Sequence, residues 1–249
     1  MIPIKSASQI KRMREACRIS AQALEVAGKS IGDGMSTKEL DNIINKFIVS
    51  CGAKPSFLGY GGFKGSACIS INDEVIHGIP SRRRIIRSGD IVSVDVGAYY
   101  DGFHGDNAYT FAVGEISQDA SKLLQITQEC LYKGIEQATP GARIGDISSA
   151  IERHATAHSL GVVKKFVGHG VGADLHEPPD VPNYGVAGRG PRLVEGMTIA
   201  IEPMINLVGE DILIMPDKWT VKTASGSLSA HFEHTIAITS DGAVILTKP

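Results

Sequence analysis

The sequence predicts an α+β fold. Two copies of one unit, a helix pair followed by a β-hairpin, form one curved antiparallel sheet with helices on its outer face. Three observations support this prediction. Gly34 and Gly141 occupy matching positions 107 residues apart (141 − 34), and so do Asp95 and Glu202 (202 − 95). Apolar residues recur at helical spacing in front of each predicted hairpin. Within the hairpins, polar and apolar residues alternate.

The first copy begins with a helix predicted over Ser6 to Ser30, and a second helix opens at GMSTKEL and ends near Cys51-Gly52. The segment GDIVSVD then reads as a strand that ends on Asp95. Asp101-Gly102 supplies a turn before the strand HGDNAYTFAVG, which carries Asp106. The two aspartates are therefore expected on neighbouring strands, where they can share a face.

The second copy repeats this order. A helix is predicted over Asp119 to Ala138, and GARIGDI opens another that runs to Leu160-Gly161. The strand GMTIAIE ends on Glu202, and Ser229 to Ile238 is predicted as one further strand that brings Glu233 beside it. The copies span about 6–113 and 117–246. We expect them to form a single domain over 1–249 with pseudo-twofold symmetry.

Composition excludes several classes of protein. The chain has 249 residues, of which 43% are hydrophobic and 21% charged, so it can bury a large core. A net charge of −2 gives no field that attracts nucleic acid, and no apolar stretch is long enough to cross a bilayer. The N-terminus lacks the pattern of a secretory signal, and the four cysteines are scattered. We therefore expect a cytoplasmic protein with free thiols that binds neither nucleic acid nor membranes directly.

Four carboxylates on one sheet face predict a metal site. Any one strand carboxylate alone would normally point to solvent. Asp95, Asp106, Glu202 and Glu233 would together repel one another, and the flanking strands contain no Lys or Arg to balance them. Two divalent cations neutralise four carboxylates, and a carboxylate can bridge two metals. His169, in the glycine-rich segment KKFVGHGVG, adds a neutral imidazole ligand.

Three other histidines lie in loop-like contexts. His77, in VIHGIP, and His176, in DLHEPP, each precede residues that stiffen the chain, which suits fixed groups at the wall of a cleft. His104, in FHGD, is interpreted as structural.

At these residues the chain resembles methionine aminopeptidase of type I, which has the pita-bread fold. The resemblance covers nearly the whole chain and rests on SINDEVIHGIP, GDIVSVDVGAYYDGFHGD, GHGVG, LHEPP, GMTIAIEPM, DKWTVKT and SLSAHFEHT, which follow in the family's order. It implies a single catalytic metallopeptidase domain with two divalent ions, of Co, Mn, Fe or Zn. It also implies one monovalent ion, Na or K, near Asn72 and Ser229. The implied metal ligands are Asp95, Asp106, His169, Glu202 and Glu233, with Asp106 and Glu233 bridging.

The resemblance also implies roles for other groups. Glu202 would shuttle the proton, and His77 and His176 would contact the substrate and act in catalysis. The implied methionine pocket consists of Tyr60, Phe63, Cys68 and Trp219. The substrates would be N-termini of nascent polypeptides with a small second residue. We expect a monomer, and association with the ribosome follows from the family alone. Leu175 and Gly61 stand where the family usually has Phe and His, which suggests a wider pocket rim.

Two alternatives stay open on the residues. A proline-directed peptidase of the same fold shares the five ligands, but such enzymes carry a large N-terminal domain, and this chain shows none. A catalytically silent member that only binds partners would be expected to have lost ligands, whereas all five are present.

Overall fold

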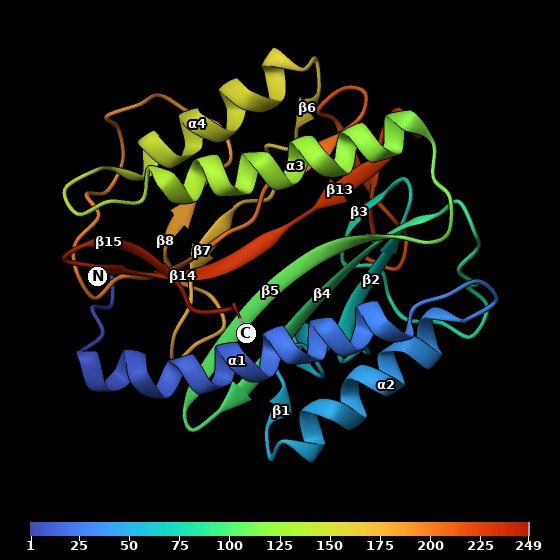
Figure 1. The fold of residues 1–249 in the computed structure, drawn as a ribbon, viewed down its shortest axis with the longest axis horizontal. Coiled ribbons are helices and arrows are strands. Elements are labelled where there is room, and N and C mark those ends of the chain that lie inside the picture. Colours follow the sequence, from blue (N-terminus) through green and yellow to red (C-terminus); the bar gives the residue numbers. More distant parts are fainter. Residues whose placement is uncertain (249) are drawn as a thin grey trace.

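Two helix pairs pack on one face of a curved antiparallel sheet in the computed structural model, which describes residues 1–248 (Figure 1). This arrangement confirms the predicted fold class. The helices are α1 (Ala7–Ser30), α2 (Thr37–Ser50), α3 (Gln118–Glu136) and α4 (Ile144–Ala157), with a short 3₁₀ turn η1 (Tyr60–Gly62). The first-half strands are β1 (Lys54–Pro55), β2 (Ala67–Ile71), β3 (Glu74–Ile76), β4 (Ile91–Tyr100) and β5 (Phe103–Ala112). The second-half strands are β6 (Gly161–Val162), β7 (Gly168–Gly170), β8 (Glu177–Val181), β9 (Thr198–Ile201), β10 (Met204–Asn206), β11 (Ile212–Ile214), β12 (Val221–Thr223), β13 (Ser229–His231), β14 (Glu233–Thr239) and β15 (Gly242–Ile245).

The main sheet joins the two halves at its centre. Its strand order is β1-β4-β5-β14-β9-β7-β8, with β2 paired to β4 and β15 paired to β14. The join is the pairing of β5 with β14, which places Glu233 opposite Ala108 (Figure 1). Two smaller three-stranded sheets, β13-β10-β6 and β11-β12-β3, complete the strand structure in the described part of the chain.

The first two helices begin where polar side chains cap their free N–H groups. The Ser6 hydroxyl accepts a hydrogen bond from the Gln9 N–H, and the Ser36 hydroxyl accepts one from the Glu39 N–H. The glycines that precede α2 and α4 in the two copies, Gly34 and Gly141, both adopt left-handed backbone angles, with φ of 84° and 89°. The repeat read from the sequence therefore corresponds to repeated local structure.

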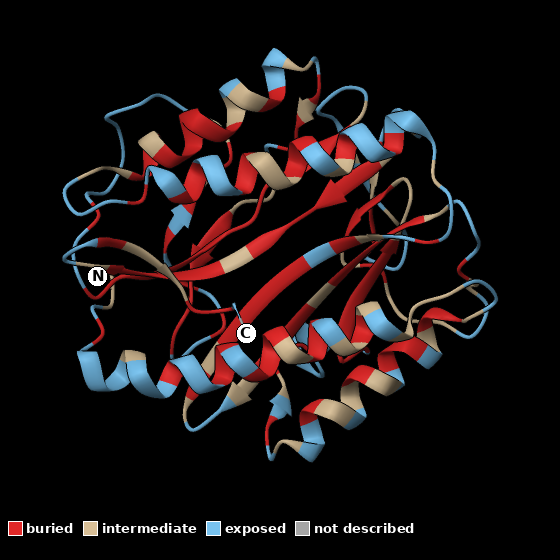
Figure 2. Ribbon diagram, viewed as in Figure 1, coloured by how far each residue is buried: buried red, intermediate tan, exposed pale blue. Residues whose placement is uncertain are grey.

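Each helix pair is packed chiefly on the strands of its own half. One buried cluster joins α1 and α2 to β2 and β4, and contains residues such as Leu40, Ile44 and Val94. A second cluster joins α3 and α4 to β9 and β14, and contains Leu123 and Ile147. Figure 2 shows the same pattern, because the sheet and the helix faces turned toward it are buried while the outer helix faces are exposed.

One predicted strand was wrong. Ser229 to Ile238 does not form a single strand but divides at Phe232 into β13 and β14. The strand β13 pairs with β10 in a small sheet, whereas β14 pairs with β5 and β9 in the main sheet. The Thr110 hydroxyl accepts from the His231 N–H and donates to the His231 carbonyl oxygen, so a side chain takes the place of ladder bonds there.

Two predictions drawn from composition can be compared with the structure. None of the helices within residues 1–248 has both the length and the apolar character needed to span a bilayer. The four cysteines are free, as predicted.

Candidate metal centre

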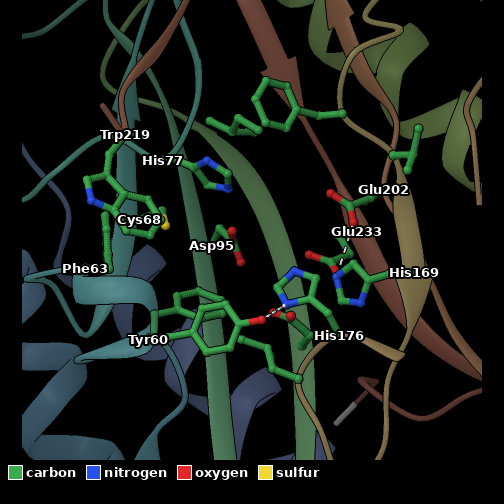
Figure 3. A pocket seen from close by; sticks show the side chains of 16 residues that line it. Tyr60, Phe63, Cys68, His77, Asp95, His169, His176, Glu202, Trp219 and Glu233 are labelled. Atoms are coloured by element: carbon green, nitrogen blue, oxygen red, sulfur yellow. Dashed lines mark hydrogen bonds and ion pairs between the residues drawn. The ribbon is translucent and has the colours of Figure 1, made fainter. Parts of the chain in front are cut away.

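A cavity of about 160 Å³ is lined by side chains from the main sheet and from the loops around it (Figure 3). Its lining includes the residues that the sequence analysis proposed as metal ligands, Asp95, Asp106, His169, Glu202 and Glu233. It also includes the two histidines and the four side chains proposed for substrate binding, His77, His176, Tyr60, Phe63, Cys68 and Trp219. Residues separated by up to 176 positions in the chain (233 − 57, from Phe57 to Glu233) therefore face one space.

Strand register brings the carboxylates together. Ala108 of β5 is the partner of both Asp95 on β4 and Glu233 on β14, so those two residues flank it on either side. Asp106 lies two positions along β5 on the same face. Glu202 directly follows the last residue of β9, whose Ile201 pairs with the residue after Glu233. Four carboxylates thus converge from the neighbouring strands β4, β5 and β14 and from the end of β9.

Two glycines allow His169 to approach this cluster. A Cβ on Gly168 would lie 2.4 Å from the Ala200 carbonyl oxygen, and one on Gly170 would lie 2.6 Å from the Pro178 carbonyl oxygen. Only glycine fits at these positions. The Nδ1 of His169 lies 2.8 Å from the Gly170 carbonyl oxygen. We assign the proton to Nδ1, because a carbonyl oxygen only accepts, and this leaves the Nε2 lone pair free to bind a metal.

The cluster has the properties of a site for divalent cations. Ligand atoms of Asp106, His169 and Glu233 all lie within 4.8 Å of one another. Asp95 Oδ1, Asp106 Oδ1 and Glu233 Oε1 are shielded from solvent and have no hydrogen-bond partner. An unpaired carboxylate oxygen away from water is costly unless a cation or a donor meets it. Oxygen ligands with one imidazole therefore fit divalent metals.

The electrostatics agree with this interpretation. Desolvation and the Asp106 charge raise the pKa of Asp95, and desolvation raises the pKa of Asp106 to about 7. Desolvation and the Asp106 charge also raise the pKa of Glu202 and of Glu233. Desolvation lowers the pKa of His169 to about 3, which keeps the imidazole in the neutral form that ligates metals. None of the side chains that line the cavity is Lys or Arg.

An apolar pocket adjoins the carboxylates. The rings of Phe63 and Trp219 meet edge to face with centroids 5.1 Å apart, and Cys68 and Leu175 pack beside Phe63. Desolvation raises the pKa of Cys68, so its side chain stays a neutral thiol. A Cβ on Gly61 would lie 3.2 Å from the Trp219 ring, so a larger residue there would press on the pocket. Four further lining residues, which carry only ordinary core or loop signals, were not identified from the sequence: Phe57, Ile76, Phe166 and Val167. Leu175, which the sequence analysis placed at the pocket rim, also lines the cavity.

The two loop histidines, His77 and His176, line the same cavity (Figure 3). His176 Nδ1 lies 2.9 Å from the Tyr60 hydroxyl oxygen, and its ring centroid lies 4.0 Å from that of His169. His77 meets the Trp219 ring edge to face. Desolvation lowers the pKa of His77 to about 4 and also lowers the pKa of His176. Both rings are therefore neutral at pH 7 and act through hydrogen bonds.

Three other residues considered in the sequence analysis lie outside the cavity lining. The Ser229 N–H donates to the Asn72 carbonyl oxygen at 2.9 Å, so these two residues are neighbours. His104 Nδ1 lies 2.9 Å from the Ser56 hydroxyl oxygen, a contact within the fold.

Comparison with known proteins decides the family. The model of metallopeptidase family M24 matches residues 11–240. The chain belongs to this family. Methionine aminopeptidase 1 of Bacillus subtilis is 51% identical to this M24 chain over 248 residues, which cover 100% of both proteins. The crystal structure of a methionine aminopeptidase from Thermotoga maritima matches all of both chains, with a TM-score of 0.98 and 44% identity. These matches confirm the resemblance.

A prolidase from Pyrococcus furiosus shows the limit of fold as a guide to substrate. Its structure matches 99% of this M24 chain with a TM-score of 0.82, but identity falls to 26% and the match covers 65% of the prolidase.

Proposed function

We propose that this M24 peptidase removes the initiator methionine from newly made proteins when the second residue is small. The observation that carries the proposal is a carboxylate cluster with an adjoining apolar pocket in one cavity. Full-length identity of 51% to a methionine aminopeptidase supports the same activity. A thioether packs well against aromatic rings and a thiol, so Phe63, Trp219 and Cys68 suit a methionine side chain.

We propose that two divalent ions are held here by Asp95, Asp106, His169, Glu202 and Glu233, with Asp106 and Glu233 contributing to both. The ligand chemistry accepts Mn, Fe, Co or Zn. When bound, such ions lower the pKa of a water molecule and polarise the scissile carbonyl.

The protein's own groups handle protons and developing charge. Glu202 is proposed to take a proton from the attacking water and to pass it to the leaving amine. The Tyr60 hydroxyl is proposed to donate to His176 Nδ1, which leaves a proton on Nε2 that can meet the carbonyl oxygen as negative charge builds. His77 is proposed to contact the substrate from the opposite wall, beside Trp219.

Tyr60 at the rim of the cavity is 47% exposed. This exposure supports access for the N-termini of nascent chains, and we propose that the protein acts as a monomer in the cytoplasm. A monovalent cation near Asn72 and Ser229 is also proposed; the contact between these two residues supports it.

The test is release of free methionine from Met-Ala-Ser and Met-Leu-Ser by chelated protein and by protein reloaded with Mn²⁺ or Co²⁺. We expect release only after reloading and chiefly from the alanine peptide. Glu202→Gln should abolish it, whereas Glu210→Gln, on the exposed surface, should not. Absence of methionine release with every metal would overturn the proposal. Cleavage of Ala-Pro instead would favour the proline-directed alternative.

A further inference from the structure

A fourth histidine, His231, lies beside the metal centre in addition to His77, His169 and His176, and the proposed mechanism gives it no role. His231 is the last residue of β13 and is 2% exposed. Neither ring nitrogen has a hydrogen-bond partner. Its main chain is held on both sides, because the Thr110 hydroxyl bonds its N–H at 2.9 Å and its carbonyl oxygen at 2.8 Å. The backbone contacts therefore hold His231 in place, while its two ring nitrogens are buried without hydrogen-bond partners.

The ring faces one particular oxygen of the metal centre. His231 Nε2 lies 3.6 Å from Glu202 Oε2, while His169 Nε2 lies 3.5 Å from Glu202 Oε1. Each carboxylate oxygen of Glu202 thus faces a different imidazole. His231 is absent from the cavity lining, so it stands behind Glu202 and does not reach the substrate.

The main chain of Glu202 is fixed as well. The Asn183 side-chain amide donates to the Glu202 carbonyl oxygen at 3.0 Å. Since both main chains are held, the freedom that remains lies in the Glu202 side chain, and its rotation decides which oxygen points into the site. A small rotation brings Oε2 within hydrogen-bonding distance of His231 Nε2.

Simple space filling does not account for this residue. A buried imidazole with two unpaired nitrogens destabilises the fold, whereas a leucine of similar volume would fill the space without that cost. A hydrogen bond to an ionised carboxylate is stronger than one between neutral groups, and it would offset the cost of burying the His231 imidazole.

We infer that His231 is a positioning residue for Glu202. Its Nε2–H holds Oε2, so that Oε1 stays directed toward His169 and the site. The inference rests on the proposed function, because it assigns Glu202 both to metal binding and to proton transfer.

The experiment compares His231→Leu with His231→Gln. The Gln amide nitrogen extends to about the place of the imidazole Nε2 and keeps a donor, whereas Leu keeps only volume. Mn²⁺ affinity is measured by titration calorimetry on chelated protein, kcat and KM are measured on Met-Ala-Ser, and urea unfolding is measured without metal. Loss of a group that orients a metal ligand typically costs about 10-fold to 100-fold in affinity or activity.

We expect His231→Leu to lose at least about 10-fold in Mn²⁺ affinity and in kcat, with KM little changed. His231→Gln should stay close to wild type in both. Chelated His231→Leu should unfold at the same or a higher urea concentration, because in the structure His231 Nε2 is still 3.6 Å from Glu202 Oε2 and neither ring nitrogen makes a hydrogen bond that could be lost. His234→Leu is the matched control, since His234 lies on the adjacent strand and its Nδ1 lies 2.9 Å from the Thr247 hydroxyl oxygen, outside the cavity lining. It should keep wild-type Mn²⁺ affinity.

Wild-type Mn²⁺ affinity and kcat in His231→Leu would overturn the inference. Equal losses in His231→Leu and His231→Gln would also overturn it, as would a loss in His231→Leu matched by lower stability of the chelated protein. If the wild type released no methionine, the proposed function would fail. The Mn²⁺ affinities of the two variants would still decide the role of His231.

Discussion

Replacing Asp106 with Asn should stabilise the metal-free protein, although it removes a side chain central to the site. Asp106 is 4% exposed, and its Oδ1 has no partner. Desolvation raises its pKa from 3.8 to about 7, so the folded state holds a proton that the unfolded chain releases at neutral pH. The ionised carboxyl therefore opposes folding, and an isosteric neutral amide removes that opposition.

The sign and size follow from linkage. Because folding raises the pKa of Asp106, this group does not lower the free energy of unfolding below the unfolded pKa of 3.8. The free energy of unfolding then falls as the pH rises from 3.8 to the folded pKa of about 7, and it stays at the lower value above that pH. At 1.36 kcal/mol for each pKa unit, the penalty is about 4 kcal/mol at pH 8 and less than about 2 kcal/mol at pH 5. The neighbouring carboxyls relieve part of it by sharing the proton. We therefore expect Asp106→Asn to gain about 2 to 4 kcal/mol at pH 8 and less than half of that at pH 5.

Urea unfolding of chelated wild type and Asp106→Asn at pH 8 and pH 5 measures the difference. In excess Mn²⁺ the wild type should instead be more stable than Asp106→Asn, because ions that bind only the folded wild type raise its free energy of unfolding and not that of the variant. A variant that is less stable than wild type without metal at pH 8, or a gain that does not shrink toward pH 5, would refute the reasoning.

Three further changes test other parts of the structure. Lys5→Met breaks a buried ion pair with Glu177 and leaves that carboxylate unpaired, so urea unfolding should show a loss of about 3 kcal/mol, with Lys164→Met at an exposed pair as the near-neutral control. Tyr60→Phe removes the hydroxyl that meets His176, so kcat on Met-Ala-Ser should fall about 10-fold while KM changes little; an unchanged kcat would remove Tyr60 from the mechanism. Gly168→Ala places a Cβ 2.4 Å from a carbonyl oxygen of β9, so thermal unfolding should occur at lower temperature and Mn²⁺ affinity should fall; wild-type values of both would contradict the packing argument.

Local pattern was enough to predict the parts of the site that depend on strands. Alternation placed Asp95 on one face of its strand, and the Asp101-Gly102 turn aligned Asp106 with it; both turn residues have positive φ, as a tight hairpin requires. The constant repeat then related Glu202 to Asp95. These inferences succeeded because strand geometry fixes which side chains share a face.

Other features depend on packing between distant segments and leave no local signal. The bond of His176 to Tyr60 spans 116 positions, and the Lys5 to Glu177 pair spans 172. The division of the predicted strand at Phe232 depends on Thr110, a residue of another strand that bonds to the main chain there. The position of His231 is a further example. Its spacing from Glu233 places it near that residue in the sequence, but its contact with Glu202 depends on how distant strands pack and has no local signal.

The most direct test of the account is to locate the metal ions. Crystals of the Mn²⁺-loaded protein should show anomalous scattering peaks among Asp95, Asp106, His169, Glu202 and Glu233, and the account predicts two peaks bridged by Asp106 and Glu233. Peaks at some other place, or none in protein that still releases methionine from Met-Ala-Ser, would contradict it.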